Sequence, residues 1–132
     1  MIALDSNVVL RLMVRDHPAH EAAAGRLFAA AARAGTPRYV ADAVLCEVVW
    51  VLRSRYGIAR GEAAAALAAL AETAGIVLEG PDAVERAIAA YREGRGDFAD
   101  YLIRERAAVR GATETVTFDR ALKGEPGFRI LP

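Results

Sequence analysis

The chain has 132 residues, of which 55% are hydrophobic and 26% charged, as in a compact globular protein rather than a disordered or fibrous one. Its 17 basic and 17 acidic residues balance, which excludes a global field that would coat nucleic acid or a membrane surface. The lone Cys46 excludes an intrachain disulfide. With neither a signal-peptide pattern nor a long apolar run, we expect one cytoplasmic domain over residues 1–132 and no membrane partner.

The predicted elements alternate between strands and helices. Residues 2–4 form a short apolar run that predicts a strand, and Ser6 or Asn7 can cap the helix that follows through residue 13. Later segments predict helices over residues 18–33, 42–56 with Asp42 as cap, 60–74, 81–92 and 97–110, and strands over residues 39–41, 76–78, 114–118 and 128–131. This alternation predicts an α/β fold, a three-layer α/β/α arrangement around a mostly parallel sheet of four to five short strands.

One glutamate interrupts the apolar run VLCEVVWVL over residues 44–52. A buried, ionised Glu47 would need a cation or hydrogen-bond donors, because burying it alone costs several kcal/mol or raises its pKa. Its neighbours at helical spacing offer no charge-assisted hydrogen bond; they are Ala43, Val44, Trp50 and Val51. Its partner must therefore come from elsewhere in the fold, from a bound ion, or from water if this face is exposed.

Other acidic residues stand where a predicted strand ends or a helix begins. Asp5 and Asp119 each follow a strand, Asp97 begins a helix, and Asp100 shares its face one turn later. Ligands of open α/β sheets bind outside the carboxyl ends of the strands, and Glu47 can reach the same edge. Crowded carboxylates repel unless they are protonated or bridged by cations, so we expect Mg²⁺, or Mn²⁺ in its place. Such ions activate water for phosphodiester hydrolysis.

Four segments carry these acids in order: DSNVVLRLMV, CEVVWVL, DFADYLI and TVTFDRAL. They resemble the PIN-domain ribonucleases, specifically the VapC-type toxins of toxin–antitoxin pairs, along the whole chain. The resemblance implies a PIN-like fold and metal-dependent endoribonuclease activity. Its catalytic and metal-binding acids carry over as Asp5, Glu47, Asp100 and Asp119, with Asp97 as a fifth ligand or a substitute for Asp100.

The resemblance also implies supporting residues and partners. Ser6 stands where the family often has threonine, Asn7 matches, and Thr117 is expected to support the last aspartate. Implied partners are a structured RNA substrate such as tRNA or rRNA, a second copy of the chain, and a cognate VapB-like antitoxin that also binds operator DNA. The segment IRERA departs from the family's small residues, and its Arg104 and Glu105 add charge that bears on antitoxin fit and substrate choice.

Simpler interpretations stand beside these. Asp97 and Asp100 resemble an acidic capping box, and Asp100 is spaced to pair with Arg104. Arg11 and Arg15 are candidate phosphate contacts or exposed cations, whereas His17 and His20 lack a third metal ligand.

Two alternative functions also remain open. One is an aspartate-nucleophile phosphatase or phosphoacceptor domain using Asp5, although Asn7 replaces the second aspartate of that pattern. The other is a non-catalytic module of PIN-like fold that binds RNA or protein.

Overall fold

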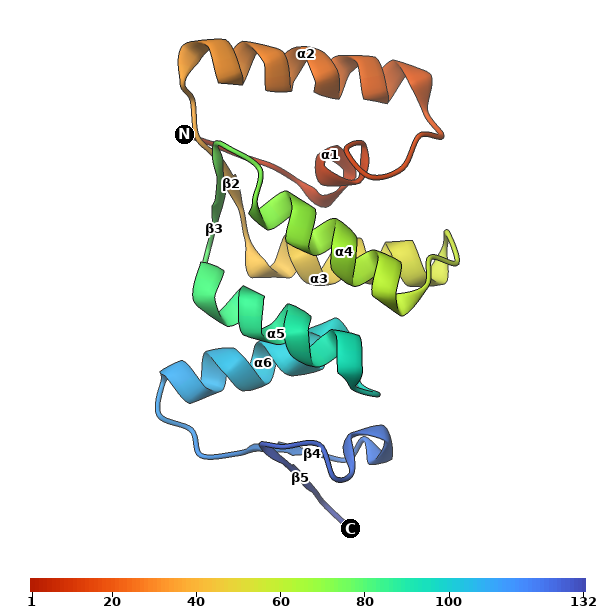
Figure 1. Cartoon of the computed structure of the whole chain (residues 1–132), viewed down its shortest axis with the longest axis vertical. Coiled ribbons are helices and arrows are strands. Elements are labelled where there is room, and N and C mark those ends of the chain that lie inside the picture. The colour runs from red at the N-terminus through yellow and green to blue at the C-terminus, as the bar shows by residue number, and fades with distance from the viewer. The chain divides into compact units, whose positions relative to one another are not determined.

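The computed structural model describes residues 1–132 as two compact units, Met1–Glu79 (unit 1) and Gly80–Pro132 (unit 2) (Figure 1). Unit 1 contains β1 (Ile2–Ala3), α1 (Ser6–Leu10), α2 (Pro18–Ala34), β2 (Arg38–Val40), α3 (Asp42–Ser54), α4 (Arg60–Ala71) and β3 (Ile76–Leu78). Unit 2 contains α5 (Pro81–Glu93), α6 (Phe98–Val109), β4 (Thr115–Thr117), the 3₁₀ helix η1 (Arg120–Leu122) and β5 (Phe128–Ile130).

The sheet of unit 1 is parallel, in the order β1-β2-β3. Ile2 pairs with Arg38, and Tyr39 pairs with Val77. Parallel neighbours require crossover connections, and each crossover here carries two helices. The chain therefore leaves β1 at the carboxyl edge of the sheet and enters α1 with Asp5 at that edge.

The core of unit 1 follows helical periodicity. The buried face of α3 recurs at helical spacing, with Leu45, Val48, Val49 and Leu52 each at most 4% exposed. Burying one such side chain contributes about 1.5–3 kcal/mol. The other face of α3 is left to solvent, and it carries Glu47 and Trp50.

Unit 2 packs two helices beside a small parallel sheet. Helices α5 and α6 share an aromatic contact, in which the rings of Tyr91 and Phe98 meet edge to face with centroids 6.1 Å apart. The strands β4 and β5 pair in parallel, with Thr115 opposite Phe128. Leu122, from η1, is fully buried in the unit.

The structure confirms the α/β class and the short parallel strands, which form a three-stranded sheet in unit 1 and a two-stranded sheet in unit 2. Three local expectations are wrong. The N-cap of α1 is Asp5, and Ser6 and Asn7, expected as caps, lie inside the helix. The first helix ends at Leu10 instead of running to residue 13. The N–H groups of residues 11–13 bond the carbonyl three residues back, as in a 3₁₀ turn, instead of the carbonyl four residues back. Asp42 is not a side-chain cap: Ala41 is the N-cap of α3, and the Asp42 N–H donates to Glu79 Oε1 at 3.1 Å. None of the helices has the length and hydropathy needed to span a bilayer.

Candidate active site

Asp5 lies between β1 and α1, and its carboxylate does not cap the helix. Its backbone carbonyl accepts the Val8 and Val9 N–H groups at 3.0 and 3.1 Å, while its side chain makes no capping hydrogen bond. The residue is exposed, as is Asn7, whereas Ser6 between them is only 3% exposed. The fold of unit 1 thus presents the Asp5 oxygens to solvent.

Glu47 lies on the exposed face of α3. The isolated carboxylate in an apolar run is explained by this helix geometry, because the apolar residues around it turn to the opposite face. The structure places this carboxylate at the solvent-exposed surface of α3 rather than in the core. Its side chain makes no ion pair within unit 1, so its oxygens are available to a ligand.

Asp97 and Asp100 hold the start of α6. They form a capping box, in which the Asp97 N–H donates to Asp100 Oδ2 at 2.8 Å. The capping box that the sequence predicts for this pair is therefore present. Asp100 does not pair with Arg104, whose guanidinium bonds Glu105 and the Pro126 carbonyl instead. The second oxygen of Asp100 is therefore not engaged by a cation.

Asp119 is fixed at the end of β4 by its own turn. The Asp119 N–H donates to Thr117 Oγ1 at 3.0 Å, and its Oδ1 accepts the Ala121 N–H at 2.9 Å. Asp119 thereby caps η1. The carboxylate is exposed and keeps its other oxygen free, and Thr117 stands in the supporting position that the sequence predicts.

Three acids of unit 2 influence one another electrostatically. Burial raises the pKa of the Asp100 carboxyl above its ordinary value of 3.8, and the negative charges of Asp97 and Asp119 raise it further. The hydrogen bond from the Asp97 N–H opposes this by lowering the pKa of Asp100. Functional sites often contain a partly buried carboxyl whose pKa is raised by burial and by repulsion from neighbouring carboxylates. A cation at this place would relieve the repulsion.

The predicted phosphate contacts behave differently from each other. Arg11 forms an ion pair with Asp16, and its guanidinium lies 3.5 Å from the Tyr56 hydroxyl, with its side chain only 10% exposed. Arg15 is 91% exposed and lies 4.0 Å from Glu21. Arg11 and Asn7 both line a cavity of about 300 Å³ in unit 1. Arg15 is therefore the more accessible of the two to a phosphate.

The two histidines have a structural role. His17 Nδ1 accepts the His20 N–H at 3.2 Å, and their rings stack with centroids 3.5 Å apart. The pair therefore caps α2.

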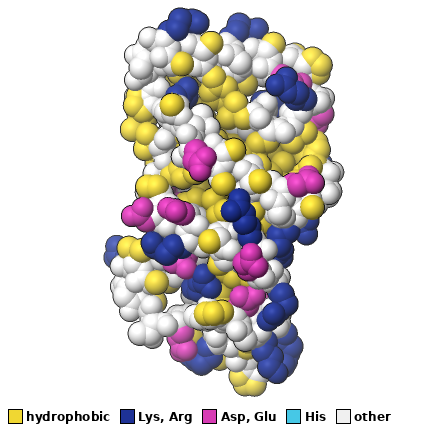
Figure 2. Space-filling model, in the orientation of Figure 1, with side chains coloured by type: hydrophobic (Ala, Val, Ile, Leu, Met, Phe, Trp, Pro, Cys, Tyr) yellow, Lys and Arg dark blue, Asp and Glu magenta, His cyan; other side chains and the backbone are white.

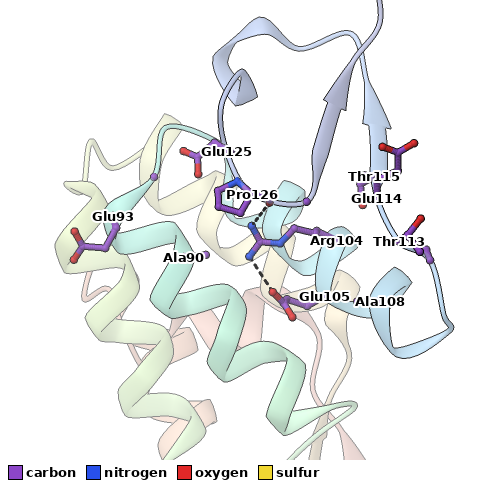
Figure 3. Close-up of a pocket in the computed structure, with 13 residues that line it drawn as sticks. Ala90, Glu93, Arg104, Glu105, Ala108, Thr113, Glu114, Thr115, Glu125 and Pro126 are labelled. Atoms are coloured by element: carbon purple, nitrogen blue, oxygen red, sulfur yellow. Dashed lines mark hydrogen bonds and ion pairs between the residues drawn. The ribbon is translucent and has the colours of Figure 1, made fainter.

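The IRERA segment helps to build a cavity of about 490 Å³ in unit 2 (Figure 3). Arg104 lies across its floor, donating to the Pro126 carbonyl and to Glu105 Oε1, each at 2.9 Å. Glu93 and Glu125 stand on its rim. None of the candidate acids lines this cavity, so it is separate from the carboxylates described above.

The candidate acids have the donor chemistry of a divalent-cation site but are divided between the two units. Carboxylate oxygens are the ligands that Mg²⁺ and Mn²⁺ prefer, and the negative charge around Asp100 suits a cation. No group of three or more His, Cys, Asp or Glu side chains converges closely enough to hold a metal. Asp5 and Glu47 belong to unit 1, and Asp97, Asp100 and Asp119 to unit 2. The chemistry of the acids therefore fits such an ion, while no complete ligand set is assembled within either unit.

The sequence interpretation missed two residues that hold the turn directly before Asp97. Tyr101 Oη accepts the buried Gly96 N–H, and Glu125 Oε1 accepts the Arg95 N–H, both at 2.9 Å. The sequence carries a glycine pair in this segment, Gly94 and Gly96. Its position directly before Asp97 was the available clue to a tight turn, whereas nothing in the local sequence marks Glu125.

Charge is mixed over the surface. On the face drawn in Figure 2, basic and acidic side chains are interspersed, which agrees with the balanced composition. A polyanion would be held there by local contacts rather than by a broad field.

A family model described as the PIN domain matches residues 2–124, which is most of the chain and includes all five candidate acids. Neither a curated protein nor a solved structure gives a significant match.

Proposed function

The chain belongs to the PIN domain family, whose members are generally nucleases, and from that premise we propose that it is a Mg²⁺-dependent endoribonuclease acting as the toxin of a VapBC-like pair. The match runs from residue 2 to residue 124 and so supports treating both units as one functional domain. The VapC-type assignment rests on the four acidic segments and their order along the chain.

The observation that carries the nuclease proposal is the PIN-domain match over residues 2–124, and the charge around Asp100 agrees with it. Burial is the main cause that raises the pKa of the Asp100 carboxyl, and the negative charges of Asp97 and Asp119 raise it further. A divalent cation bound there would offset this repulsion. The residues proposed to hold Mg²⁺ or Mn²⁺ are Asp5, Glu47, Asp100 and Asp119, with Asp97 as an additional ligand. When bound, the ion would activate water and neutralise charge developing on the phosphoryl group.

We propose the remaining properties on the same resemblance. The substrate is a structured RNA such as tRNA or rRNA, and the active form is a cytoplasmic homodimer. A VapB-like antitoxin silences the activity and provides the contact with operator DNA. The phosphatase alternative is not favoured, because Asn7 occupies the position of its second aspartate and the family match points to nucleases.

The decisive experiment compares the parent protein with Asp5→Ala after induction in cells, with RNA ends sequenced in both. We expect new, discrete RNA ends with the parent and none with Asp5→Ala. The purified parent should cleave the same RNA, and EDTA should stop that cleavage. Equal cleavage by both proteins would contradict the proposal, and tight RNA binding without EDTA-sensitive cleavage would favour a non-catalytic module.

A further inference from the structure

A tight turn, Gly94–Arg95–Gly96, connects α5 to α6 in unit 2. It lies directly before Asp97, and its two glycines leave no room for side chains. A Cβ on Gly94 would lie 1.9 Å from the Tyr101 hydroxyl, and one on Gly96 would lie 2.5 Å from Leu122 Cδ2. Such distances are far below van der Waals contact, so a side chain at either position would force the buried Tyr101 or Leu122 to move.

The carboxylate of Glu125 binds the backbone of this turn. It accepts the Arg95 N–H at 2.9 Å and also a hydrogen bond from Tyr101. These bonds, the Arg95 N–H first, hold the pKa of Glu125 below its ordinary value of 4.5. Tyr101 Oη accepts the Gly96 N–H, and Tyr101 itself is fully buried in α6. The start of α6, with Asp97 and Asp100, is thus tied to Glu125.

The side chain of Arg95 connects this turn to the segment around η1. Its guanidinium donates from Nε to the Ala121 carbonyl at 3.2 Å and from Nη2 to the Lys123 carbonyl at 2.5 Å. Both carbonyls belong to the segment around η1, where Asp119 Oδ1 accepts the Ala121 N–H. One arginine therefore ties the turn before α6 to the turn that orients Asp119.

From these contacts we infer that Arg95, supported by Glu125 and Tyr101, is a positioning residue that holds Asp119 in register with Asp97 and Asp100 for the cleavage reaction. The catalytic half of this inference rests on the proposed nuclease function. Arg95 itself touches backbone carbonyls and no candidate ligand. Its contribution is therefore geometric, and a misplacement of about 1 Å in an active site can cost roughly 100-fold in rate.

The test variant is Arg95→Ala, with Arg92→Ala as the matched control. Arg92 is an exposed arginine in the last turn of α5 and makes no ion pair or hydrogen bond with its side chain, so its removal changes charge but no contact. Because Arg95 is exposed and lies outside the buried core, we expect both variants to fold. Arg95→Lys tests charge against geometry, since one ammonium cannot reproduce a guanidinium fork.

The first measurement follows the backbone without any substrate. The ¹⁵N order parameters of residues 119–122 should be close to about 0.85 in the parent and should fall toward about 0.6 in Arg95→Ala, with Arg92→Ala like the parent. Unchanged order parameters in Arg95→Ala would overturn the positioning role, whatever the activity shows.

The second measurement splits kcat from KM for RNA cleavage and follows the shift in Tm on adding Mn²⁺. Arg95→Ala should lower kcat by about 10- to 100-fold with KM unchanged, and should reduce the Mn²⁺-induced shift in Tm. Arg95→Lys should restore only part of the loss. A raised KM with unchanged kcat in Arg95→Ala would show that the Arg95 guanidinium contacts RNA, and it would overturn the inference. An equal loss of kcat in Arg92→Ala would overturn it as well, because the effect would then be one of charge. If the parent neither cleaves RNA nor binds Mn²⁺, the proposed function fails as well, while the order parameters still report separately on the turn.

Discussion

The candidate acids of the two units are held in opposite ways. In unit 1, Asp5 and Glu47 are exposed and their carboxylates make no hydrogen bond or ion pair within the unit. In unit 2, Asp100 accepts the Asp97 N–H and Asp119 accepts the Ala121 N–H, so these carboxylates are part of the local fold. Substitutions in unit 1 should therefore report on function alone, whereas those in unit 2 should change stability as well.

The largest expected effect comes from unit 1. Glu47→Gln should lower the rate of RNA cleavage by at least about 100-fold, since even the loss of a group supporting a metal ligand costs roughly 10- to 100-fold. The free energy of unfolding should stay within about 0.5 kcal/mol of the parent, because the substitution is on the exposed face of α3. Cleavage assays and urea unfolding measure the two quantities. The exposed Glu62 on α4 offers the control Glu62→Gln, which should change neither, and a fully active Glu47→Gln would remove Glu47 from the site.

The next effect contrasts the same hydroxyl deletion in the two units. Tyr101→Phe in unit 2 removes the acceptor of the buried Gly96 N–H, and an unsatisfied buried group costs about 1–3 kcal/mol. Tyr56→Phe in unit 1 removes a hydroxyl that donates to the exposed Asp16 at 2.6 Å, and water can replace it. Urea unfolding should show a larger loss for Tyr101→Phe. An equal or reversed order would mean that the turn before α6 is less dependent on Tyr101 than its geometry indicates.

A smaller effect separates the cap from the ligand at Asp97. Asp97→Ala removes the capping side chain and should cost about 0.5–2 kcal/mol, while Asp97→Asn keeps a capping oxygen and should cost only a few tenths. Comparing cleavage by Asp97→Asn with cleavage by the parent, at a temperature where both are folded, then isolates the charge. Activity near the parent's in Asp97→Asn would assign Asp97 to the cap alone, and a loss of tenfold or more would assign it to the ion.

Much of the fold was predictable because its signals are local. The helices of α2 and α5 begin at Pro18 and Pro81, where proline suits a first turn, and Gly35 ends α2 in the left-handed region with φ of 65°. The sequence also predicted the capping box at Asp97, since both of its members lie within one turn. These elements depend on neighbours in the chain and so can be read without the tertiary structure.

The contacts that the sequence did not predict are those made at long range. Glu125 lies 30 residues beyond Arg95, whose N–H it accepts, and Glu79 lies 37 residues beyond Asp42, where it takes over the capping role that was expected of Asp42 itself. Sequence spacing carries no information on such pairs. The exposure of Glu47 was undecided for a related reason, since periodicity defines two faces of a helix but not which of them a neighbouring element covers.

The smallest expected effect concerns the pH dependence of stability at Asp100. Because burial and neighbouring charges raise the pKa of Asp100 in the folded state, its contribution to stability is fully present below the ordinary value of 3.8 and is lost as the pH rises through the raised pKa. Asp100→Asn keeps an oxygen for the Asp97 N–H and removes the charge. In EDTA, Asp100→Asn should therefore have a higher free energy of unfolding than the parent at about pH 7. The difference should be no more than about 1 kcal/mol, because solvent screens a partly exposed carboxyl. Below about pH 4 the two proteins should be equally stable. The pKa values of Glu105 and Glu125 are lowered, so the parent and the variant both lose the stability that these two groups contribute as the pH falls. This loss cancels in the difference between the two proteins.

Added Mg²⁺ should reverse the order of stability at about pH 7, because it should stabilise the parent alone. A variant that is still more stable than the parent in saturating Mg²⁺ would argue that Asp100 binds no ion.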